Sequence, residues 1–259
     1  MNMSTAREHS ELPVSTPDTF LGAAFGYPCR YAQLPLDFNG LARELHATSG
    51  PAFMWIKVPD QADPAFKALE DLGFRIAVEE ISYERPGDKP APASSTSSSF
   101  TITTIPLSKA PDHADLADEV GALAADNLKT SRFHLDPLIN DAIAGEVKKR
   151  WAMNFFKGLR GQEMIVATAP DGRIVGFNQV LIGPNHKVID LICTADDFRR
   201  RGVARALVNA MFEDDKTIRV GSQANNIAAD AFYRSLGFMP VATSLCLHWH
   251  SPIHPQKAL

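Results

Sequence analysis

Two hydrophobic patterns divide this chain into predicted strands and helices. Continuous apolar runs, and runs that alternate with polar residues, predict β-strands, whereas apolar residues that recur every three or four positions predict helices. The predicted strands are residues 25–34, 52–58, 74–84, 100–105, 164–168, 173–182, 187–194, 217–220 and 241–250. The predicted helices are residues 39–48, 64–72, 112–128, 136–155, 199–211 and 227–236.

The order of these elements predicts an α/β (α+β) chain with two structured parts. Residues 18–85 alternate between strands and helices and form a predicted small α/β domain. Residues 86–99 are rich in Pro and Ser and contain no apolar residue larger than alanine before Phe100, so they predict a linker. Residues 100–259 form a larger predicted domain that contains three consecutive antiparallel strands. Residues 1–17 are polar and predict a flexible N-terminus.

Composition and charge narrow the class of protein. The 259 residues suffice for one large or two modest domains, and a hydrophobic content of 45% supports a real core. The net charge of −4 argues against a nucleic-acid partner. No apolar run approaches the roughly 20 residues that span a membrane, and no signal-peptide pattern follows Met1, so we expect a cytoplasmic protein without a membrane partner. The three cysteines are odd in number and the histidines are scattered, so neither a disulfide framework nor a metal site is expected.

The segment from Val188 to Leu207 is the most informative in the chain. It begins as an apolar strand interrupted only by Asp190, continues through a polar turn, and ends in three arginines and Gly202 at a predicted helix start. The first N–H groups of a helix lack internal partners and the helix dipole adds positive charge, so such an end binds phosphate. Gly202 has no Cβ and lets an anion approach the backbone. An exposed basic helix start without a ligand is the alternative.

Two motifs, taken together, resemble the GNAT acetyltransferases. Arg199, Gly202 and Ala204 match the family pattern Gln/Arg-x-x-Gly-x-Gly/Ala between a strand and a helix. A second family block, N-x-x-A-x-x-x-Y-x-x-x-G-F, is matched by Asn226, Ala229, Tyr233, Gly237 and Phe238. The resemblance implies the GNAT fold, a mixed and mostly antiparallel sheet flanked by helices, and acetyl-CoA as the co-substrate. It implies a cofactor site that comprises Cys193, Thr194, Arg199, Arg200, Arg201, Gly202, Val203, Ala204, Arg205 and Asn226.

The segment from Ser131 to Phe133 narrows the resemblance. Together with Trp151 and Tyr233, it is similar to the dTDP-fucosamine acetyltransferases, which also carry a small α/β half-domain and a linker. That resemblance implies a nucleotide-linked 4-amino-deoxy sugar as acceptor and a substrate site that comprises Arg132, Phe133, His134 and Trp151. The alternative places Phe133 and Trp151 in the core and Arg132 at the surface.

The chemistry that the resemblance implies is direct attack of a neutral amine on the thioester in a ternary complex. A backbone N–H near Cys193 or Thr194 would bind the oxyanion, and Tyr233 would protonate the leaving thiolate. For Tyr233 the alternative is a tyrosine that only packs on the sheet. The general base is left open, because the face on which Asp190 lies is not fixed by the sequence. Cys193 is not favoured as an acyl carrier, since no base stands beside it in sequence.

Two other functions stay open. The first is a GNAT acetyltransferase that acts on an amino acid, a peptide or an antibiotic amine. The second is an acyl-CoA-sensing module without catalysis. The expected partner of an enzyme is a small-molecule amine, and a homodimer is compatible with the sequence.

The smaller predicted domain repeats one feature of the larger one. The predicted helices of residues 64–72 and 227–236 both end in Leu-Gly-Phe and lead into a strand. This echo predicts a GNAT-like half-domain at the N-terminus. It has no counterpart of the motif at residues 199–204, so no cofactor is assigned to it. Ordinary helix termination by glycine is the alternative.

Overall fold

The computed structural model describes residues 14–87, 99–212 and 215–252. The chain divides into two compact units, of which the first runs to Ile76 and resumes at Leu245, and the second comprises Ala77–Ser244. The predicted domains divide the chain differently, with residues 77–85 in the smaller domain and the whole final strand in the larger one. Most of the predicted linker and of the predicted flexible N-terminus lies outside the described residues.

The sheet of the second unit is mixed and mostly antiparallel. Four strands pair antiparallel in the order β5 (Thr101–Pro106), β6 (Glu163–Thr168), β7 (Ile174–Ile182) and β8 (His186–Thr194). Strand β8 then pairs in parallel with β9 (Thr217–Gln223), which pairs antiparallel with β4 (Arg75–Arg85). This is the sheet type that the GNAT resemblance implies.

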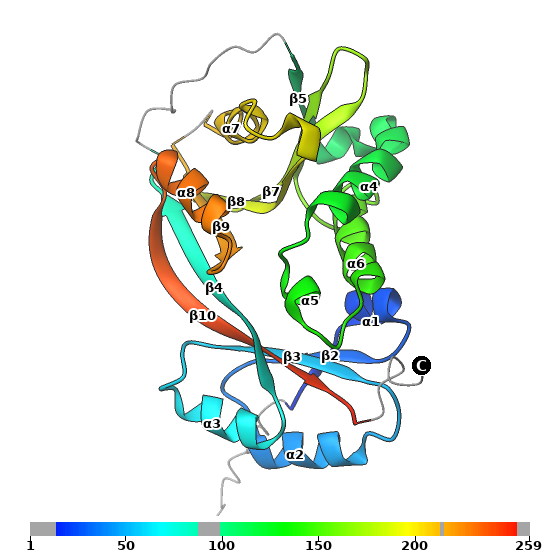
Figure 1. The fold of residues 1–259 in the computed structure, drawn as a ribbon, viewed down its shortest axis with the longest axis vertical. Coiled ribbons are helices and arrows are strands. Elements are labelled where there is room, and N and C mark those ends of the chain that lie inside the picture. The colour runs from blue at the N-terminus through cyan, green and yellow to red at the C-terminus, as the bar shows by residue number, and fades with distance from the viewer. Residues whose placement is uncertain (1–13, 88–98, 213–214, 253–259) are drawn as a thin grey trace, which may run out of the picture. The chain divides into compact units, whose positions relative to one another are not determined.

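Alternation along the strands buries both faces of this sheet. In β6, Met164 and Val166 belong to one core cluster, and Ile165 and Ala167 belong to another. The first cluster is covered by the helices α4 (Ala117–Asn127) and α6 (Asp141–Met153), which pack against each other (Figure 1). The second is covered by α7 (Val203–Asn209) and α8 (Ile227–Ser235). Strands buried on both faces need nearly continuous apolar sequence, which explains the apolar runs of this part of the chain.

Local capping residues fix two helices where the sequence predicts them. Helix α3 (Pro64–Asp71) follows Asp63, and α8 follows Asn226, and each cap side chain accepts a hydrogen bond from the first turn of its helix. Gly73 and Gly237, with φ of 94° and 84°, end the same two helices. Such caps act within a few residues of sequence, which is why the pattern predicts them.

Helix α6 begins later than predicted. Asn140 caps it, and the Oδ1 atom of Asn140 accepts a hydrogen bond from the N–H of Ile143 at 2.8 Å. Asp136, the predicted cap, instead accepts a hydrogen bond from the N–H of Leu138 at 2.9 Å in a turn. The predicted start was wrong because two cap-forming residues compete within five positions.

The predicted helix of residues 112–128 is also shorter than expected. Pro111 and the non-helical His113 keep the preceding residues in the 3-10 helix η1 (Leu107–Leu116), so α4 starts only afterwards.

Among the described residues, no helix combines the length and the apolarity that crossing a bilayer requires.

The chain turns sharply between β8 and α7. After the 3-10 helix η2 (Asp196–Phe198), Arg200 and Gly202 both adopt left-handed backbone conformations, with φ of 60° and 86°. Helix α7 therefore begins at Val203 rather than at the arginines. Gly176 on β7 lets this helix pack directly on the sheet, because a Cβ atom at that position would lie 2.7 Å from Val203 Cγ1.

The first unit contains the strands β1, β2 and β3 and the end of β10. Strand β2 (Cys29–Ala32) pairs antiparallel with β1 (Thr16–Pro17) and parallel with β3 (Phe53–Val58), and β3 pairs antiparallel with the end of β10 (Met239–His250). Helices α2 (Phe38–Ala47) and α3 lie on one side of β2 and β3 (Figure 1). The order β2–α2–β3–α3–β4, with a parallel β2–β3 pair, parallels the order β8–α7–β9–α8–β10. The kinship of the two halves remains a prediction.

Helix α1 (Thr19–Phe25) ends on Phe25, the first residue of the predicted strand. Asp18 caps the helix by accepting a hydrogen bond from the N–H of Leu21 at 2.9 Å, and Gly26, with φ of 77°, ends it. Of the predicted strand of residues 25–34, only β2 forms a strand.

Candidate functional site

Strand β8 loses its parallel neighbour halfway along its length. It pairs with β9 only from His186 to Ile189. Further along, residues 221–223 of β9 pair with β4, while β8 continues along β7 as far as Thr194. Within the described residues, the edge of β8 that faces away from β7 therefore has no strand partner after Ile189. We call residues 190–194 on this side the free edge of β8.

The backbone donors of the free edge follow from strand geometry. The N–H of Ala195 donates to the carbonyl of Val175 on β7 at 2.9 Å. Because residues along an antiparallel strand alternate in the direction of their N–H groups, the N–H of Cys193 also faces β7. The N–H of Thr194 faces the free edge. Of the two predicted oxyanion donors, Thr194 is thus the one that this geometry favours.

Asp190 occupies a β-bulge at the start of the free edge. Gln179 pairs with Leu191 and Val180 pairs with Ile189, which leaves Asp190 as the extra residue. A bulge breaks strict alternation and redirects a side chain. Leu191 belongs to the core under α4 and α6, and Asp190 binds Trp151 of α6, so both lie toward the same helices. The structure thereby answers which face Asp190 occupies.

The carboxylate of Asp190 accepts four hydrogen bonds. Its side chain is 6% exposed. Oδ2 accepts from Trp151 Nε1 at 2.8 Å, from Arg160 Nε at 2.7 Å and from Gln179 Nε2 at 3.0 Å. Oδ1 accepts from the Nη2 atom of Arg160 at 2.6 Å. With both oxygens occupied, Asp190 positions its neighbours rather than standing free to accept a proton from an amine.

Lys148 lies beside this network, on the same helix as Trp151. Its Nζ atom is 4.7 Å from the centroid of the Trp151 ring, and the residue is 8% exposed. Burial and, to a smaller extent, the positive charge of Arg132 together lower the pKa of Lys148 to about 8, against the opposing charges of Asp190 and Glu80. Lys148 is therefore mostly charged at neutral pH but close to its titration range.

The predicted substrate residues Arg132 and Phe133 lie in the short helix α5 (Arg132–Leu135). Phe133 is 1% exposed, so its ring is a buried packing group. The Cζ atom of the Arg132 guanidinium lies 4.7 Å from the centroid of that ring, and its charge acts on Lys148. Arg132 and Trp151 therefore both lie near Lys148, which the sequence did not single out.

His134, in the same short helix, has one ring nitrogen without a partner. Its Nδ1 atom is 2.8 Å from Ser131 Oγ, whereas its buried Nε2 atom has no hydrogen-bond partner among the described residues. Burial lowers the pKa of His134, and the charges of Lys129 and Lys148 also oppose its protonation. The ring is therefore predominantly neutral at pH 7.

The predicted cofactor segment of Arg199, Arg200, Arg201 and Gly202 is exposed. A positive φ is uncommon in a residue other than glycine, and here Arg200 adopts one two residues before Gly202. Left-handed residues in a turn can direct successive N–H groups into one concavity that binds anions. Arg199 pairs with Asp196 at 2.6 Å. These exposed cations and this backbone fit the pyrophosphate that the family resemblance implies.

The other predicted cofactor residues connect neighbouring elements. The first turn of α7 starts with Val203, which is buried in the core. Arg205 of α7 donates to Ser235 Oγ of α8 at 3.1 Å. Asn226, the cap of α8, donates through Nδ2 to Thr130 Oγ1 at 3.3 Å. The helices α7 and α8 and the segment that precedes α5 are thus linked around the predicted site.

Tyr233 lies on the buried face of α8. It is 4% exposed, and the centroids of the Tyr83, Phe232 and Phe238 rings lie 5.8, 5.3 and 5.6 Å from its own. Its hydroxyl makes no hydrogen bond with any residue that the structure describes. Burial raises the pKa of Tyr233 above its ordinary value of about 10, and nearby Tyr83 adds to the shift. The hydroxyl is therefore protonated at neutral pH, the form that a general acid requires.

Cys193 is a buried thiol directed at the protein interior. Its Sγ atom lies 3.5 Å from the carbonyl oxygen of Leu123, and burial raises its pKa to about 12. A protonated, buried thiol is a poor nucleophile. This agrees with the expectation that Cys193 is not an acyl carrier.

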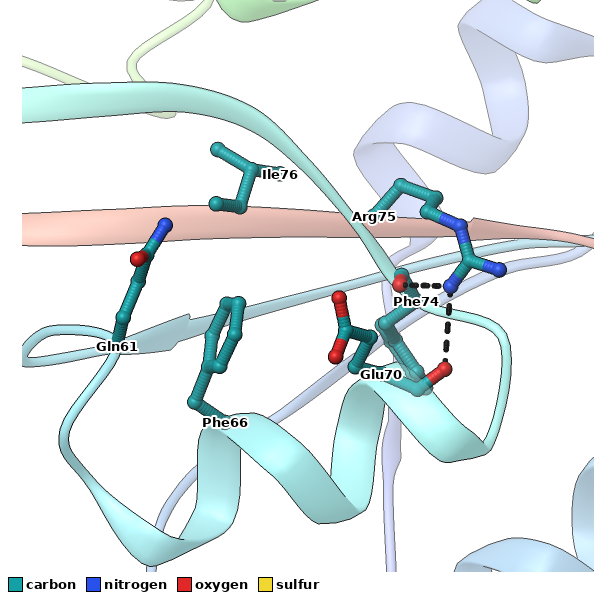
Figure 2. Close-up of a pocket in the computed structure, with 6 residues that line it drawn as sticks. All are labelled: Gln61, Phe66, Glu70, Phe74, Arg75 and Ile76. Carbon is teal, nitrogen blue, oxygen red and sulfur yellow. Dashed lines mark hydrogen bonds between the residues drawn. The ribbon is translucent and has the colours of Figure 1, made fainter.

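A pocket of the first unit contains none of the predicted site residues. Figure 2 shows this pocket of about 360 Å³, which is lined by Gln61, Phe66, Glu70, Phe74, Arg75 and Ile76. Nη1 of Arg75 donates to the backbone carbonyls of Glu70 and Phe74 at 3.1 and 2.7 Å, as the dashed lines of Figure 2 mark. Its guanidinium is thereby engaged by the protein itself.

Residues 160–240 match the family model of the acetyltransferase (GNAT) domain. They extend from before β6 to the start of β10 and include the arginine segment and Tyr233. Over these residues the chain is therefore similar to the GNAT acetyltransferases. This match supports the predicted acyl-CoA-dependent N-acetyltransferase, and GNAT acetyltransferases use acetyl-CoA. Among curated proteins, no sequence matches the chain.

Solved structures confirm the GNAT fold. A GCN5-related N-acetyltransferase from Sphaerobacter thermophilus is 15% identical, with a TM-score of 0.55 over 83% of this chain and 66% of that one. A putative GNAT acetyltransferase from Novosphingobium aromaticivorans is 20% identical, with a TM-score of 0.51 over 85% of this chain and 82% of that one. A conserved protein of unknown function from Staphylococcus epidermidis is 11% identical, with a TM-score of 0.57 over 94% of each chain.

Three candidate residues of this unit were missed at the level of sequence. Lys148 stands in a Lys-Lys-Arg run, which is typical of a solvated helix face. Arg160 lies in a loop with no motif. Gln179 did carry a signal, because it is a polar residue within an otherwise apolar strand and must find a partner when buried. In the folded chain that partner is the bulged Asp190.

Proposed function

We propose that the protein acetylates the 4-amino group of a nucleotide-linked amino-deoxy sugar, with acetyl-CoA as the donor. The observation that carries this proposal is the group of basic and aromatic side chains beside the free edge of β8: Arg132, Lys148, Trp151 and Arg160, arranged around Asp190. Guanidinium and ammonium groups suit a diphosphate, and an indole suits a sugar or base ring.

Acetyl-CoA would supply the acetyl thioester, and the exposed segment of residues 199–202 would hold its pyrophosphate. The left-handed backbone at Arg200 and Gly202 and the three neighbouring arginines support this placement. Asn226 and Arg205 would keep the helices on either side of the site in place.

The protein's own groups would then have two tasks during acetyl transfer. The N–H of Thr194, on the free edge, would donate to the carbonyl oxygen as negative charge develops there. The hydroxyl of Tyr233 would give its proton to the departing sulfur as the C–S bond breaks. An amino-sugar amine titrates near an α-amino group, at about 7.7–8.0, so a useful neutral fraction exists at neutral pH and its surplus proton can leave to water.

The test is a panel of acceptors assayed by release of free thiol from acetyl-CoA. It comprises nucleotide-linked 4-amino-6-deoxy sugars, amino acids, short peptides and aminoglycosides. We expect the highest kcat/KM for a nucleotide-linked sugar. Activity confined to amino acids or aminoglycosides would contradict the proposed acceptor and leave the enzyme class intact.

An amino acid or peptide amine is the second candidate acceptor. The same cations that suit a diphosphate also suit a carboxylate, through charge-assisted hydrogen bonds. Polycationic antibiotics fit these surroundings less well, because Arg132, Lys148 and Arg160 outnumber the nearby carboxylates of Asp190 and Glu80. Binding of acetyl-CoA without turnover of any amine would instead favour an acyl-CoA-sensing module.

A cytoplasmic location belongs to the same proposal. Cys29, Cys193 and Cys246 are buried and form no disulfide among the described residues. Cysteines without disulfides are typical of a reducing compartment.

A further inference from the structure

Lys148 of the second unit is a largely buried lysine. The residue is 8% exposed, and within the described residues its ammonium makes no hydrogen bond and no ion pair. Its contact is the face of the Trp151 ring, at 4.7 Å. A largely buried ammonium is costly unless it is paired, and Nζ of Lys148 is not among the polar atoms that are both fully buried and without a partner, so a partner from outside the chain can reach it.

The carboxylates near Lys148 do not form an ion pair with its ammonium. Asp190 acts on Lys148 through its charge, but its two oxygens already accept four hydrogen bonds, two of them from Arg160. Glu80 acts more weakly than Asp190, and Arg132 adds a further positive charge from α5. The surroundings of Lys148 therefore favour an anion.

Lys148 also stands next to the place where an acceptor is proposed to bind. Trp151, one helical turn later on α6, hydrogen-bonds to Asp190 at the start of the free edge of β8. Two other residues of this region have buried polar atoms without a partner among the described residues, Nε2 of His134 and Oε1 of Gln179. We propose that Lys148 binds an anionic group of the acceptor, a phosphate or a carboxylate, and so selects amines that carry one. This inference rests on the proposed function.

The first test measures binding and needs no turnover. Wild type, Lys148→Met and the control Lys149→Met are saturated with coenzyme A, so that its own phosphate site is filled. Inorganic phosphate, thymidine diphosphate and acetate are then titrated, and binding is followed by calorimetry. We expect Lys148→Met to bind the preferred anion about 10–100-fold more weakly, the range of a hydrogen bond to a charged group, and Lys149→Met to bind it as wild type does. A preference for the phosphates or for acetate identifies the source of the anion.

The second test separates anion binding from proton transfer. Lys148→Met is assayed on an anionic acceptor and on a neutral amine of the same skeleton. We expect KM for the anionic acceptor to rise about 10–100-fold and kcat/KM for the neutral amine to stay within about threefold of wild type. Equal losses on both acceptors would overturn the proposal, because they would place Lys148 in a step common to all amines. Anion binding that is unchanged in Lys148→Met would overturn it as well.

The two tests distinguish failure of this inference from failure of the proposed function. If no amine is turned over but anion binding depends on Lys148, the proposed reaction fails and the anion site stands. If a nucleotide sugar is turned over equally well by wild type and Lys148→Met, the reaction stands and the anion site fails. Lys148→Gln provides a second variant, and circular dichroism of each variant checks that it is folded.

Discussion

The indole Nε1 of Trp151 donates a hydrogen bond to Oδ2 of Asp190 at 2.8 Å. The bond joins α6 to the bulge of β8, 39 residues away in sequence. The sequence left open whether Trp151 is a core residue or a substrate residue, and it left the face of Asp190 undecided. The bond shows that the polar end of the indole is held by the carboxylate that marks the start of the free edge.

Removal of the Asp190 carboxylate should destabilise the fold strongly. In Asp190→Ala, four donor groups, two of them on Arg160 and one each on Trp151 and Gln179, lose their acceptor. Breaking a buried pair by removing one partner costs about 3–5 kcal/mol, but the Arg160 side chain is 42% exposed and can be solvated, so we expect about 2–3 kcal/mol. Urea denaturation measures this loss.

The control for Asp190→Ala is Asp197→Ala. Asp197 also pairs with an arginine, Arg173, at 2.6 Å, but both side chains are about half exposed. Exposed pairs contribute little because water and salt screen them. We therefore expect the midpoint of urea denaturation of Asp197→Ala to equal that of wild type. Equal midpoints for both variants would show that the Asp190 network does not stabilise the fold.

A comparison of Asp190 with the residues that cap helices shows what the sequence could predict. Caps such as Asp63 and Asn226 act over two or three residues, so the pattern around them predicts α3 and α8 correctly. Asp190 depends on a bulge that arises between two strands, and no local pattern reveals it. Lys148 looks like Lys149 in sequence, and only the packing of α6 against the sheet buries one of them and not the other.

The buried ammonium of Lys148 should cost stability at neutral pH. Folding lowers the pKa of Lys148 from 10.5 to about 8. Between these values the unfolded chain binds more protons than the folded one, so the contribution of this group to stability rises with pH. Below pH 8 the full cost is present, on the order of 1–3 kcal/mol. We therefore expect Lys148→Met to be more stable than wild type at pH 7 by about this amount.

Urea denaturation at pH 7 and at pH 9.5 tests the sign of this effect. The advantage of Lys148→Met over wild type should shrink at the higher pH, because wild-type Lys148 is then largely neutral. Lys149→Met is the matched control, since the neighbouring side chain is only partly buried. A variant at position 148 that is less stable than wild type at pH 7 would mean that the ammonium is paired in solution.

Substitution of Gly202 should remove binding of acetyl-CoA. Gly202→Glu puts a negative side chain where the pyrophosphate is proposed to lie, and it also strains a backbone with φ of 86°. Gly172→Glu is the matched control, because Gly172 has φ of 89° in the hairpin between β6 and β7, and a Cβ atom added there would meet nothing within 4 Å. Both variants should lose about 1–2 kcal/mol of stability from backbone strain.

Thermal shift with added acetyl-CoA separates the two variants. A ligand that binds only the folded state raises the melting temperature. Wild type and Gly172→Glu should be stabilised by acetyl-CoA, and Gly202→Glu should not. Equal stabilisation of all three proteins would show that the pyrophosphate does not bind at this segment.

Substitution of Tyr233 by phenylalanine should lower kcat with little change in stability. The hydroxyl makes no hydrogen bond to the described residues, so its loss leaves the packing against Tyr83 and Phe238 unchanged. If the hydroxyl protonates the departing thiolate, kcat should fall by about 10²–10⁴, the usual contribution of a positioned general acid. KM for acetyl-CoA should change little, because an interaction made in the transition state appears in kcat.

Tyr83→Phe is the control for Tyr233→Phe. Its hydroxyl donates to Asp230 Oδ1 at 2.7 Å, so its loss should cost about 1 kcal/mol of stability and leave kcat within about twofold of wild type. Tyr233→Phe should thus lose turnover and keep its stability, whereas Tyr83→Phe should lose stability and keep its turnover. Steady-state assays from about pH 6 to 9 bracket the expected titration of the amine and show whether a solvent proton replaces the hydroxyl at low pH. Wild-type kcat in Tyr233→Phe across that range would mean that Tyr233 is a packing residue and that the sulfur receives its proton from water or from another side chain.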